Sequence, residues 1–236
     1  MTINKIKRKQ TKSIEEFNRE LVHIFIKKVS ECLDNNDKVF VGISGGNTPK
    51  PFFDIIAREY NKKIEWEKIY FFWVDERCVP SDHPDSNFGS AKKLLLNDLP
   101  RVNYFPIKGD IKPSISARDY EKILKKYLPT DDGVPCFDIL LLGMGKDGHV
   151  ASLFPGTDIL NTKNKFVDFV WVPKLDSYRI SLTLPTLNAA KSRIVAFHGS
   201  EKNKLFNKIQ NTKKITRPIQ LLSYSDTEDY FITCPK

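Results

Sequence analysis

The 236-residue chain lacks the features of membrane, secreted and disulfide-stabilised proteins. No apolar run approaches the roughly 18 residues that a membrane-spanning helix needs. The basic stretch at residues 1–12 has no apolar segment of the kind found in signal peptides. The four cysteines are scattered, without a CxxC pair, so we expect reduced thiols, a cytoplasmic location and no membrane partner.

Repeats and low-complexity tracts are also missing. Hydrophobic residues make up 40% of the chain and charged residues 28%, which is typical of an ordinary globular protein. The length is sufficient for one large domain with a real core, or at most for two small ones. We expect residues 1–236 to form a single domain.

Acidic residues are the minority among the charged side chains, and the net charge is +9. Such a charge suits either nucleic acid or a small anionic molecule. The lysines, however, are spread through amphipathic segments and are not gathered with aromatic residues. This distribution is typical of a solvated surface, so we expect no nucleic-acid partner.

An apolar run of strand length at residues 137–142 leads into a loop that contains Gly143, Gly145, Asp147, Gly148 and His149. Glycine permits positive φ and a close approach of backbone to ligand. The imidazole of a histidine gains and loses a proton near neutral pH. The stretch therefore predicts a loop shaped for a small ligand beside a titratable side chain.

Apolar runs of strand length alternate with segments of helical periodicity along the chain. Strands are expected at residues 38–43, 68–74, 103–107, 137–142, 166–172, 178–184, 193–198, 219–223 and 229–233, and helices at 13–33, 49–60, 87–96, 114–128 and 200–210, with a short one from 185. Ser13, Thr48 and Asn87 are the expected N-caps, with Pro49 at a first helical position. The alternation predicts an α/β fold, namely a three-layer, mainly parallel Rossmann-like sheet with helices on both faces.

Ligands of such sheets bind beyond the carboxyl ends of the strands. Residues 44–48, 75–77 and 143–149 all follow predicted strands, so we expect them to meet in one crevice. The charged cluster Asp75, Glu76 and Arg77 has two interpretations from sequence. Arg77 either pairs with a neighbouring carboxylate at the sheet edge or acts on a ligand.

Gly143, Gly145 and Gly148 match the spacing of the dinucleotide-binding fingerprint, and Asp168 follows 20 residues after Gly148. That fingerprint must open a full helix whose N-terminus holds the pyrophosphate. Residues 155–156 are Pro-Gly and leave no room for such a helix. We therefore expect no dinucleotide cofactor.

Gly42, Ser44 and Gly46 match the nucleophile elbow of serine hydrolases. In an elbow the helix begins directly after the serine, whereas Thr48 and Pro49 place the helix start later. Successive backbone N–H groups ahead of a helix N-terminus suit a phosphate. The sequence favours a phosphate loop over a serine nucleophile, and both over a glycine turn without a ligand.

The chain resembles the 6-phosphogluconolactonase family at these residues and at several others. The matching segments are Ser44-Gly45-Gly46-x-Thr48-Pro49, Asp75-Glu76-Arg77-x-Val79-Pro80, His83-Pro84-Asp85-Ser86-Asn87, Gly143-Met144-Gly145-x-Asp147-Gly148-His149-x-Ala151-Ser152-Leu153-Phe154-Pro155 and Arg179-x-Ser181-Leu182-Thr183-Leu184-Pro185. They span most of the chain in the order of the family. Two residues depart from the family pattern. Asn47 stands where the family commonly has serine or threonine, and Val150 stands where it usually has threonine.

The resemblance implies the fold shared with amino-sugar-phosphate deaminases and ribose-5-phosphate isomerases. It also implies hydrolysis of 6-phosphogluconolactone to 6-phosphogluconate in the oxidative pentose phosphate pathway, without a metal or a cofactor. The related deaminases usually have a tyrosine in place of Arg77 and a different segment after the histidine. Residues 151–155 therefore favour the lactonase.

The resemblance also suggests roles for single residues. The catalytic set is His149 as the base, Asp147, Arg77 and Asp75. The substrate-binding set is Ser44, Gly45, Gly46, Asn47, Thr48, Asn87, Gly145, Arg179 and Lys202. Asp147 either orients His149 or bonds its own backbone in a turn, and Arg77 meets either the oxyanion or a sugar hydroxyl.

Three other functions stay open from sequence. A serine esterase would act through Ser44, a sugar-phosphate deaminase or isomerase would use Asp75 as its base, and a sugar-phosphate sensor would bind without turnover. For the lactonase we expect a phosphosugar lactone as the small-molecule partner, and a monomer or weak homodimer.

Overall fold

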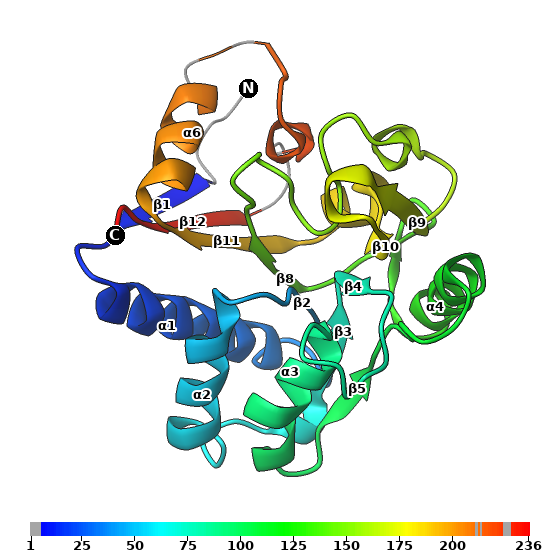
Figure 1. Ribbon diagram of the computed structural model, residues 1–236. Coiled ribbons are helices and arrows are strands. Elements are labelled where there is room, and N and C mark those ends of the chain that lie inside the picture. Colours follow the sequence, from blue (N-terminus) through cyan, green and yellow to red (C-terminus); the bar gives the residue numbers. More distant parts are fainter. Residues whose placement is uncertain (1–5, 211, 213, 224–227) are drawn as a thin grey trace.

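The computed structural model describes residues 6–210, 212, 214–223 and 228–236 (Figure 1). Its helices are α1 (Ile14–Leu33), α2 (Pro49–Glu59), α3 (Asn87–Leu94), α4 (Pro113–Tyr127), α5 (Leu184–Asn188) and α6 (Ser200–Gln210). Its strands are β1 (Ile6–Gln10), β2 (Val39–Ile43), β3 (Ile69–Trp73), β4 (Asp75–Arg77), β5 (Asn103–Phe105), β6 (Thr130–Asp131), β7 (Val134–Pro135), β8 (Ile139–Gly143), β9 (Val167–Val172), β10 (Ser177–Leu182), β11 (Ser192–His198) and β12 (Glu228–Cys234).

Seven strands form a fully parallel sheet in the order β1-β12-β11-β8-β2-β3-β5. The central strands β2, β3 and β8 are almost entirely apolar and buried. A parallel sheet covered by helices on both faces buries both sides of its strands, which explains runs of apolar residues without alternation. The predicted α/β class and mainly parallel sheet are confirmed.

Helices α1 and α6 cover opposite faces of this sheet. The ring of Phe17 in α1 contacts His198 of β11, and the ring of Phe206 in α6 contacts Phe197 of the same strand. Successive side chains of a strand point to opposite faces. The two helices therefore enclose the sheet between them, which gives the predicted three layers (Figure 1).

A second sheet was not predicted. Strands β4, β10 and β9 pair antiparallel to one another, apart from the main sheet. In this register Arg179 lies opposite Arg77, and Ser181 opposite Asp75. Strands β9 and β10 are joined by one 3₁₀ turn, η4 (Pro173–Leu175), so they form a hairpin. Helix α4 packs against both of them.

Some local predictions were wrong. Residues 219–223 form no strand, because Pro218 cannot donate a ladder hydrogen bond and begins the 3₁₀ turn η5 (Pro218–Leu221). Strand β1 was missed, since four of its five residues are exposed and show no apolar pattern. Ser13 does cap α1, through a hydrogen bond from the Glu16 N–H.

One predicted N-cap was also wrong, and a second, Thr48, occupies the N-cap position of α2 without a capping hydrogen bond. Ser86, not Asn87, caps α3, because the Ser86 hydroxyl accepts the Gly89 N–H at 3.0 Å. Thr48 already has helical backbone angles, and its side chain makes no capping hydrogen bond. Both residues are thereby available to the pocket described below.

Among the described residues, no helix is both long and apolar enough to cross a bilayer.

Candidate active site

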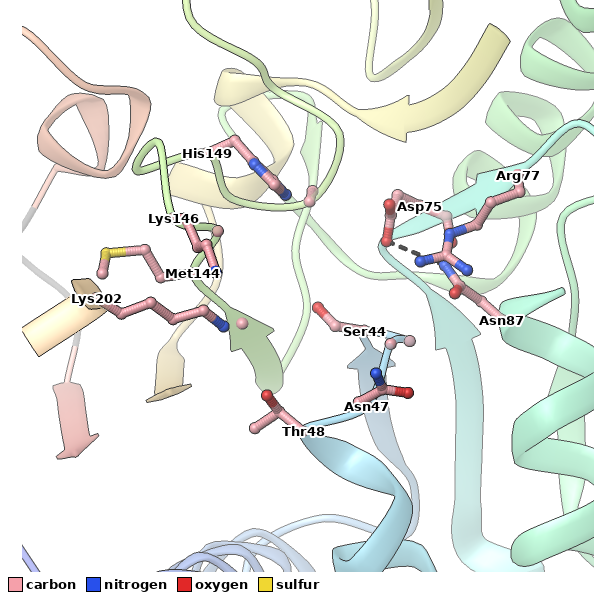
Figure 2. Close-up of a pocket in the computed structure, with 15 residues that line it drawn as sticks. Ser44, Asn47, Thr48, Asp75, Arg77, Asn87, Met144, Lys146, His149 and Lys202 are labelled. Carbon is pink, nitrogen blue, oxygen red and sulfur yellow. Dashed lines mark hydrogen bonds between the residues drawn. The ribbon is translucent and has the colours of Figure 1, made fainter. Parts of the chain in front are cut away.

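A pocket of about 320 Å³ opens where β2, β3 and β8 reach their carboxyl ends (Figure 2). Its lining consists of Ser44, Gly45, Gly46, Asn47, Thr48, Asp75, Arg77, Asn87, Gly143, Met144, Gly145, Lys146, His149, Ala151 and Lys202. The three segments that the sequence placed at this edge, two loops and strand β4, thus meet in one pocket. All of the predicted site residues except Asp147 and Arg179 line it.

His149 and Asp147 form a hydrogen-bonded pair beside the pocket. The His149 Nδ1 lies 2.6 Å from the Asp147 Oδ1, which also accepts the His149 backbone N–H at 3.2 Å. Both contacts considered for Asp147, to the ring and to the local backbone, are therefore present. An ionised carboxylate only accepts hydrogen bonds, so the neutral imidazole carries its proton on Nδ1 and leaves Nε2 as the proton-accepting nitrogen.

The carboxylate of Asp147 is held in its charged form. Burial opposes the charge, but hydrogen bonds from His149 and from Lys174 outweigh burial and keep the pKa of Asp147 well below its usual range. Lys174 reaches Oδ2 from the turn between β9 and β10. Asp147 is consequently ionised at every pH at which a histidine titrates.

Glycine at position 145 allows the imidazole to lie where it does. A Cβ at this position would be 2.1 Å from both the Nδ1 and the Cε1 of His149. Gly148 has a φ of +80°, and its missing side chain makes room for Arg217. On its other side the imidazole packs on Phe154, with ring centroids 4.1 Å apart. The close approach of the His149 and Arg217 side chains to the backbone, and not a pyrophosphate, explains why Gly145 and Gly148 are glycines.

Asp75 and Asn87 form a second hydrogen-bonded group across the pocket from His149 (Figure 2). The Asn87 Nδ2 donates to the backbone oxygen of Asp75 at 2.9 Å and to its Oδ1 at 3.3 Å. The buried Ser152 hydroxyl donates to the Asp75 Oδ2 at 2.6 Å. A Cβ on Gly45 would collide with Asn87, at 1.8 Å from its Oδ1.

Arg77 lies at the pocket edge, and its guanidinium donates to the backbone oxygen of Asp85 at 2.5 Å. Arg179 lies one strand further out, opposite Arg77, where it donates to the Ser177 hydroxyl at 2.6 Å. Burial, with the charge of Arg77 adding to it, lowers the pKa of Arg179. Arg77 thus lines the pocket, whereas Arg179 is its neighbour on the next strand and does not line it.

The buried carboxylate of Glu76 holds this corner together. It accepts the backbone N–H groups of Arg77, Asn87 and Phe88 at 2.7–2.8 Å, and the Ser86 hydroxyl at 3.2 Å. Burial raises the pKa of Glu76, against the effect of the three N–H groups. Because Asn87 and Phe88 begin α3, Glu76 fixes the start of that helix against β4.

The loop after β2, predicted to bind a phosphate, lies directly before a helix N-terminus. Gly46 has a φ of +88°, and the loop leads directly into the N-terminus of α2. The Ser44 N–H is used within the fold, by the Leu141 oxygen at 3.0 Å. Its buried hydroxyl, by contrast, has no hydrogen-bond partner in the part of the chain that the structure describes. Ser44 can therefore contribute only its hydroxyl to a ligand.

Lys202 of α6 and Lys146 of the glycine loop face the loop after β2 from the other side of the pocket (Figure 2). Burial, and secondly the charge of Lys146, lowers the pKa of Lys202. Lys146 also pairs with Glu201 at 2.7 Å. Two neighbouring cations near a helix N-terminus would be stabilised by a dianion such as a phosphate monoester.

A model of the glucosamine-6-phosphate isomerase/6-phosphogluconolactonase family matches residues 12–231. The chain belongs to this family. A 6-phosphogluconolactonase from Nostoc sp. is 37% identical over 183 residues, which cover 76% of the chain and 74% of the relative. One from Treponema pallidum is 32% identical over 211 residues, covering 88% and 87%.

Solved structures of this family agree with the fold. The 6-phosphogluconolactonase from Trypanosoma brucei superposes with a TM-score of 0.88 at 26% identity, covering 98% of the chain and 96% of that structure. The enzyme from Thermotoga maritima gives a TM-score of 0.82 at 28% identity, covering 98% and 100%. All four of these relatives are 6-phosphogluconolactonases, and none is a glucosamine-6-phosphate isomerase.

For this member of the isomerase/lactonase family, sequence reasoning missed several residues. Met144, Lys146 and Ala151 line the pocket, Ser152 holds Asp75, and Lys174 holds Asp147. The first four lie within or beside the glycine stretch, which was a sufficient signal to include them. Lys174 is 27 residues from Asp147, and no local pattern distinguishes it from the other lysines.

Proposed function

We propose that this protein hydrolyses 6-phosphogluconolactone to 6-phosphogluconate in the oxidative pentose phosphate pathway, with His149 as the general base. One observation carries the mechanism: the His149 imidazole is held by an ionised aspartate and borders a pocket that is also lined by the loop of residues 44–48 before α2. The lactonases among its relatives supply the substrate class.

The reaction needs one proton carrier. His149 Nε2 takes a proton from a water molecule as the water oxygen attacks the lactone carbonyl carbon. The tetrahedral oxyanion collapses, the bond from the carbonyl carbon to the ring oxygen breaks, and the imidazolium returns the proton to that ring oxygen. The ionised Asp147 stabilises the imidazolium between the two steps, because its Oδ1 accepts from Nδ1.

The substrate orientation follows from the charges around the pocket. The phosphate binds the loop of Ser44, Gly45, Gly46, Asn47 and Thr48, with Lys202 beside it. The lactone ring then extends toward His149, Asp75 and Arg77. Arg77 stabilises the developing oxyanion, and Asp75 and Asn87 hold the sugar hydroxyls. Removing one electrostatic contact to an oxyanion costs about 100-fold in rate or more.

The serine-esterase alternative lacks its nucleophile–base contact. In the described residues, the Ser44 hydroxyl has no hydrogen-bond partner, so it is not paired with His149. Both carboxylate oxygens of Asp75 accept hydrogen bonds from Ser152 or Asn87, which weakens the case for Asp75 as the base of an isomerase or deaminase. These observations support the lactonase over the two alternatives.

The test is a direct assay. 6-Phosphogluconolactone is generated in place from glucose 6-phosphate, and its disappearance is followed against spontaneous hydrolysis. We expect fast hydrolysis by the wild type, a raised KM with kcat retained in Ser44→Ala, and no labelling by a fluorophosphonate. Release of ammonia from glucosamine 6-phosphate, without lactone hydrolysis, would contradict the proposal.

A cytoplasmic location and a monomeric or weakly dimeric state are part of the same proposal. All four cysteines are free thiols, which supports a reducing compartment. Cell fractionation and light scattering coupled to size-exclusion chromatography test the two statements.

A further inference from the structure

Lys174 occupies the tip of the β9–β10 hairpin, within the turn η4 (Pro173–Leu175). Its ammonium group donates to the Asp147 Oδ2 and lies 4.7 Å from the centroid of the Phe154 ring. These two residues are also the ones that contact the His149 imidazole, Asp147 at Nδ1 and Phe154 at the ring face. Lys174 therefore touches both supports of His149.

Lys174 itself does not line the pocket. Its side chain is 51% exposed, so an ion pair made only for stability would contribute little. What distinguishes this pair is its location, because one carboxylate serves His149 with one oxygen and Lys174 with the other. Rotation of the Asp147 carboxylate would break both contacts together.

We propose that Lys174 is a positioning residue for the lactonase reaction, which fixes the Asp147 carboxylate and, through it, the His149 imidazole. This inference rests on the proposed function. The physical reason is electrostatic: the aspartate alone favours the imidazolium, whereas the lysine charge offsets part of that effect. The hairpin thereby supports a base that lies in a different loop.

Other charged groups surround the His149 loop and stay in place when Lys174 changes. They are Asp75 and Arg77 of β4, Lys202 of α6, Lys146 with its partner Glu201, and Arg217 against Gly148. A difference between the wild type and a Lys174 variant therefore reports the lysine, not these groups.

The experiment compares Lys174→Met and Lys174→Arg with the wild type in the lactone assay between pH 5 and pH 8. Removing the charge favours the imidazolium, so the acidic limb of kcat/KM should move to higher pH by about half a unit for an exposed charge at this range. Arginine keeps the charge and a donor, and should restore the wild-type profile. Lys165→Met is the matched control, since Lys165 is an exposed lysine that pairs with Asp168.

A second measurement does not need turnover. The His149 ring proton signal, assigned by its loss in His149→Asn, is titrated by NMR in the wild type and in Lys174→Met. We expect a higher midpoint in the variant. An unchanged midpoint and pH profile, or an effect confined to KM, would overturn the proposal. Lack of lactone hydrolysis by the wild type would instead overturn the proposed function, while the NMR titration would still decide the role of Lys174.

Discussion

At the scale of single residues, Gly145 is the position that most directly limits the placement of the base. Gly145→Ala would put a methyl group 2.1 Å from the His149 ring, so the imidazole must leave Asp147. We expect kcat to fall by about 100-fold, the lower end of what a general base contributes, with folding retained. Steady-state kinetics and a thermal melt measure the two effects.

Gly133→Ala is the control for this substitution. Gly133 has a φ of +78° in the turn between β6 and β7, outside the pocket, and an added Cβ would meet nothing within 4 Å. Alanine there strains a turn, at a cost of about 1 kcal/mol, without moving the imidazole. Equal losses of activity in both variants would contradict the steric role of Gly145.

Residues of the site could be predicted from sequence where their chemistry is local. Gly145 is required by the His149 ring four residues away, so this requirement is contained in one stretch of sequence. The partners Lys174 and Arg179 are placed by the β9–β10 hairpin and its register, which no short motif encodes. The contact of Lys174 was therefore missed, and Arg179, predicted to bind substrate, does not line the pocket.

At the scale of elements, Glu76 joins β4 to the start of α3. Glu76→Ala would leave the buried N–H groups of Arg77, Asn87 and Phe88 without their acceptor. We expect a loss of about 3 kcal/mol or more in the free energy of unfolding, with a fall in activity because Asn87 and Arg77 shift. Urea unfolding and the lactone assay measure both. Glu76→Gln keeps one acceptor oxygen, so its free energy of unfolding should lie between those of Glu76→Ala and the wild type. A Glu76→Ala variant as stable as the wild type would refute the structural role of Glu76.

Glu228 joins β12 to α1 and to the edge strand β1. Its carboxylate accepts from Lys28 at 2.6 Å and from Lys7 at 2.5 Å. Burial opposes its charge, but the hydrogen bonds from Lys28, Lys7 and Tyr230 outweigh burial and lower its pKa to about 2. A lowered folded-state pKa adds stability that is present above the unfolded value of about 4.3 and is lost as the pH falls.

Glu228→Gln should therefore be less stable than the wild type at pH 7, with a difference that disappears as the pH falls from 5 toward 2. Urea unfolding at several pH values measures it. Glu59→Gln, which removes a carboxylate paired with Arg19 on the surface, should show a much smaller difference. A difference for Glu228→Gln that does not depend on pH would contradict this account.

Elements could be predicted from sequence where burial leaves a pattern. The buried strands β2, β3 and β8 and the amphipathic α1 were found, because their apolar residues recur with the period of the element. β1 contributes mainly backbone to the sheet edge, and its side chains are exposed. The separation of β4, β9 and β10 into their own sheet is a matter of pairing, which apolar periodicity does not reveal.

At the scale of the whole molecule, the net charge of +9 would attract the phosphorylated substrate proposed above. Salt screens attraction between exposed charges over a Debye length of about 10 Å at 0.1 M. We expect the KM for the lactone to rise several-fold between about 0.05 M and 0.5 M salt, with kcat unchanged. Lys202→Met should raise KM at low salt and flatten this dependence. A salt effect confined to kcat would contradict a role of Lys202 and of the net positive charge in substrate binding.

The central claim is that His149 is the base of a lactonase, and one comparison tests it most directly. The initial rate of 6-phosphogluconolactone disappearance is measured for the wild type and for His149→Ala, at equal protein concentration and against the spontaneous rate. The account predicts fast hydrolysis by the wild type and a rate near the spontaneous one in the variant. A variant that hydrolyses the lactone as fast as the wild type would contradict the account.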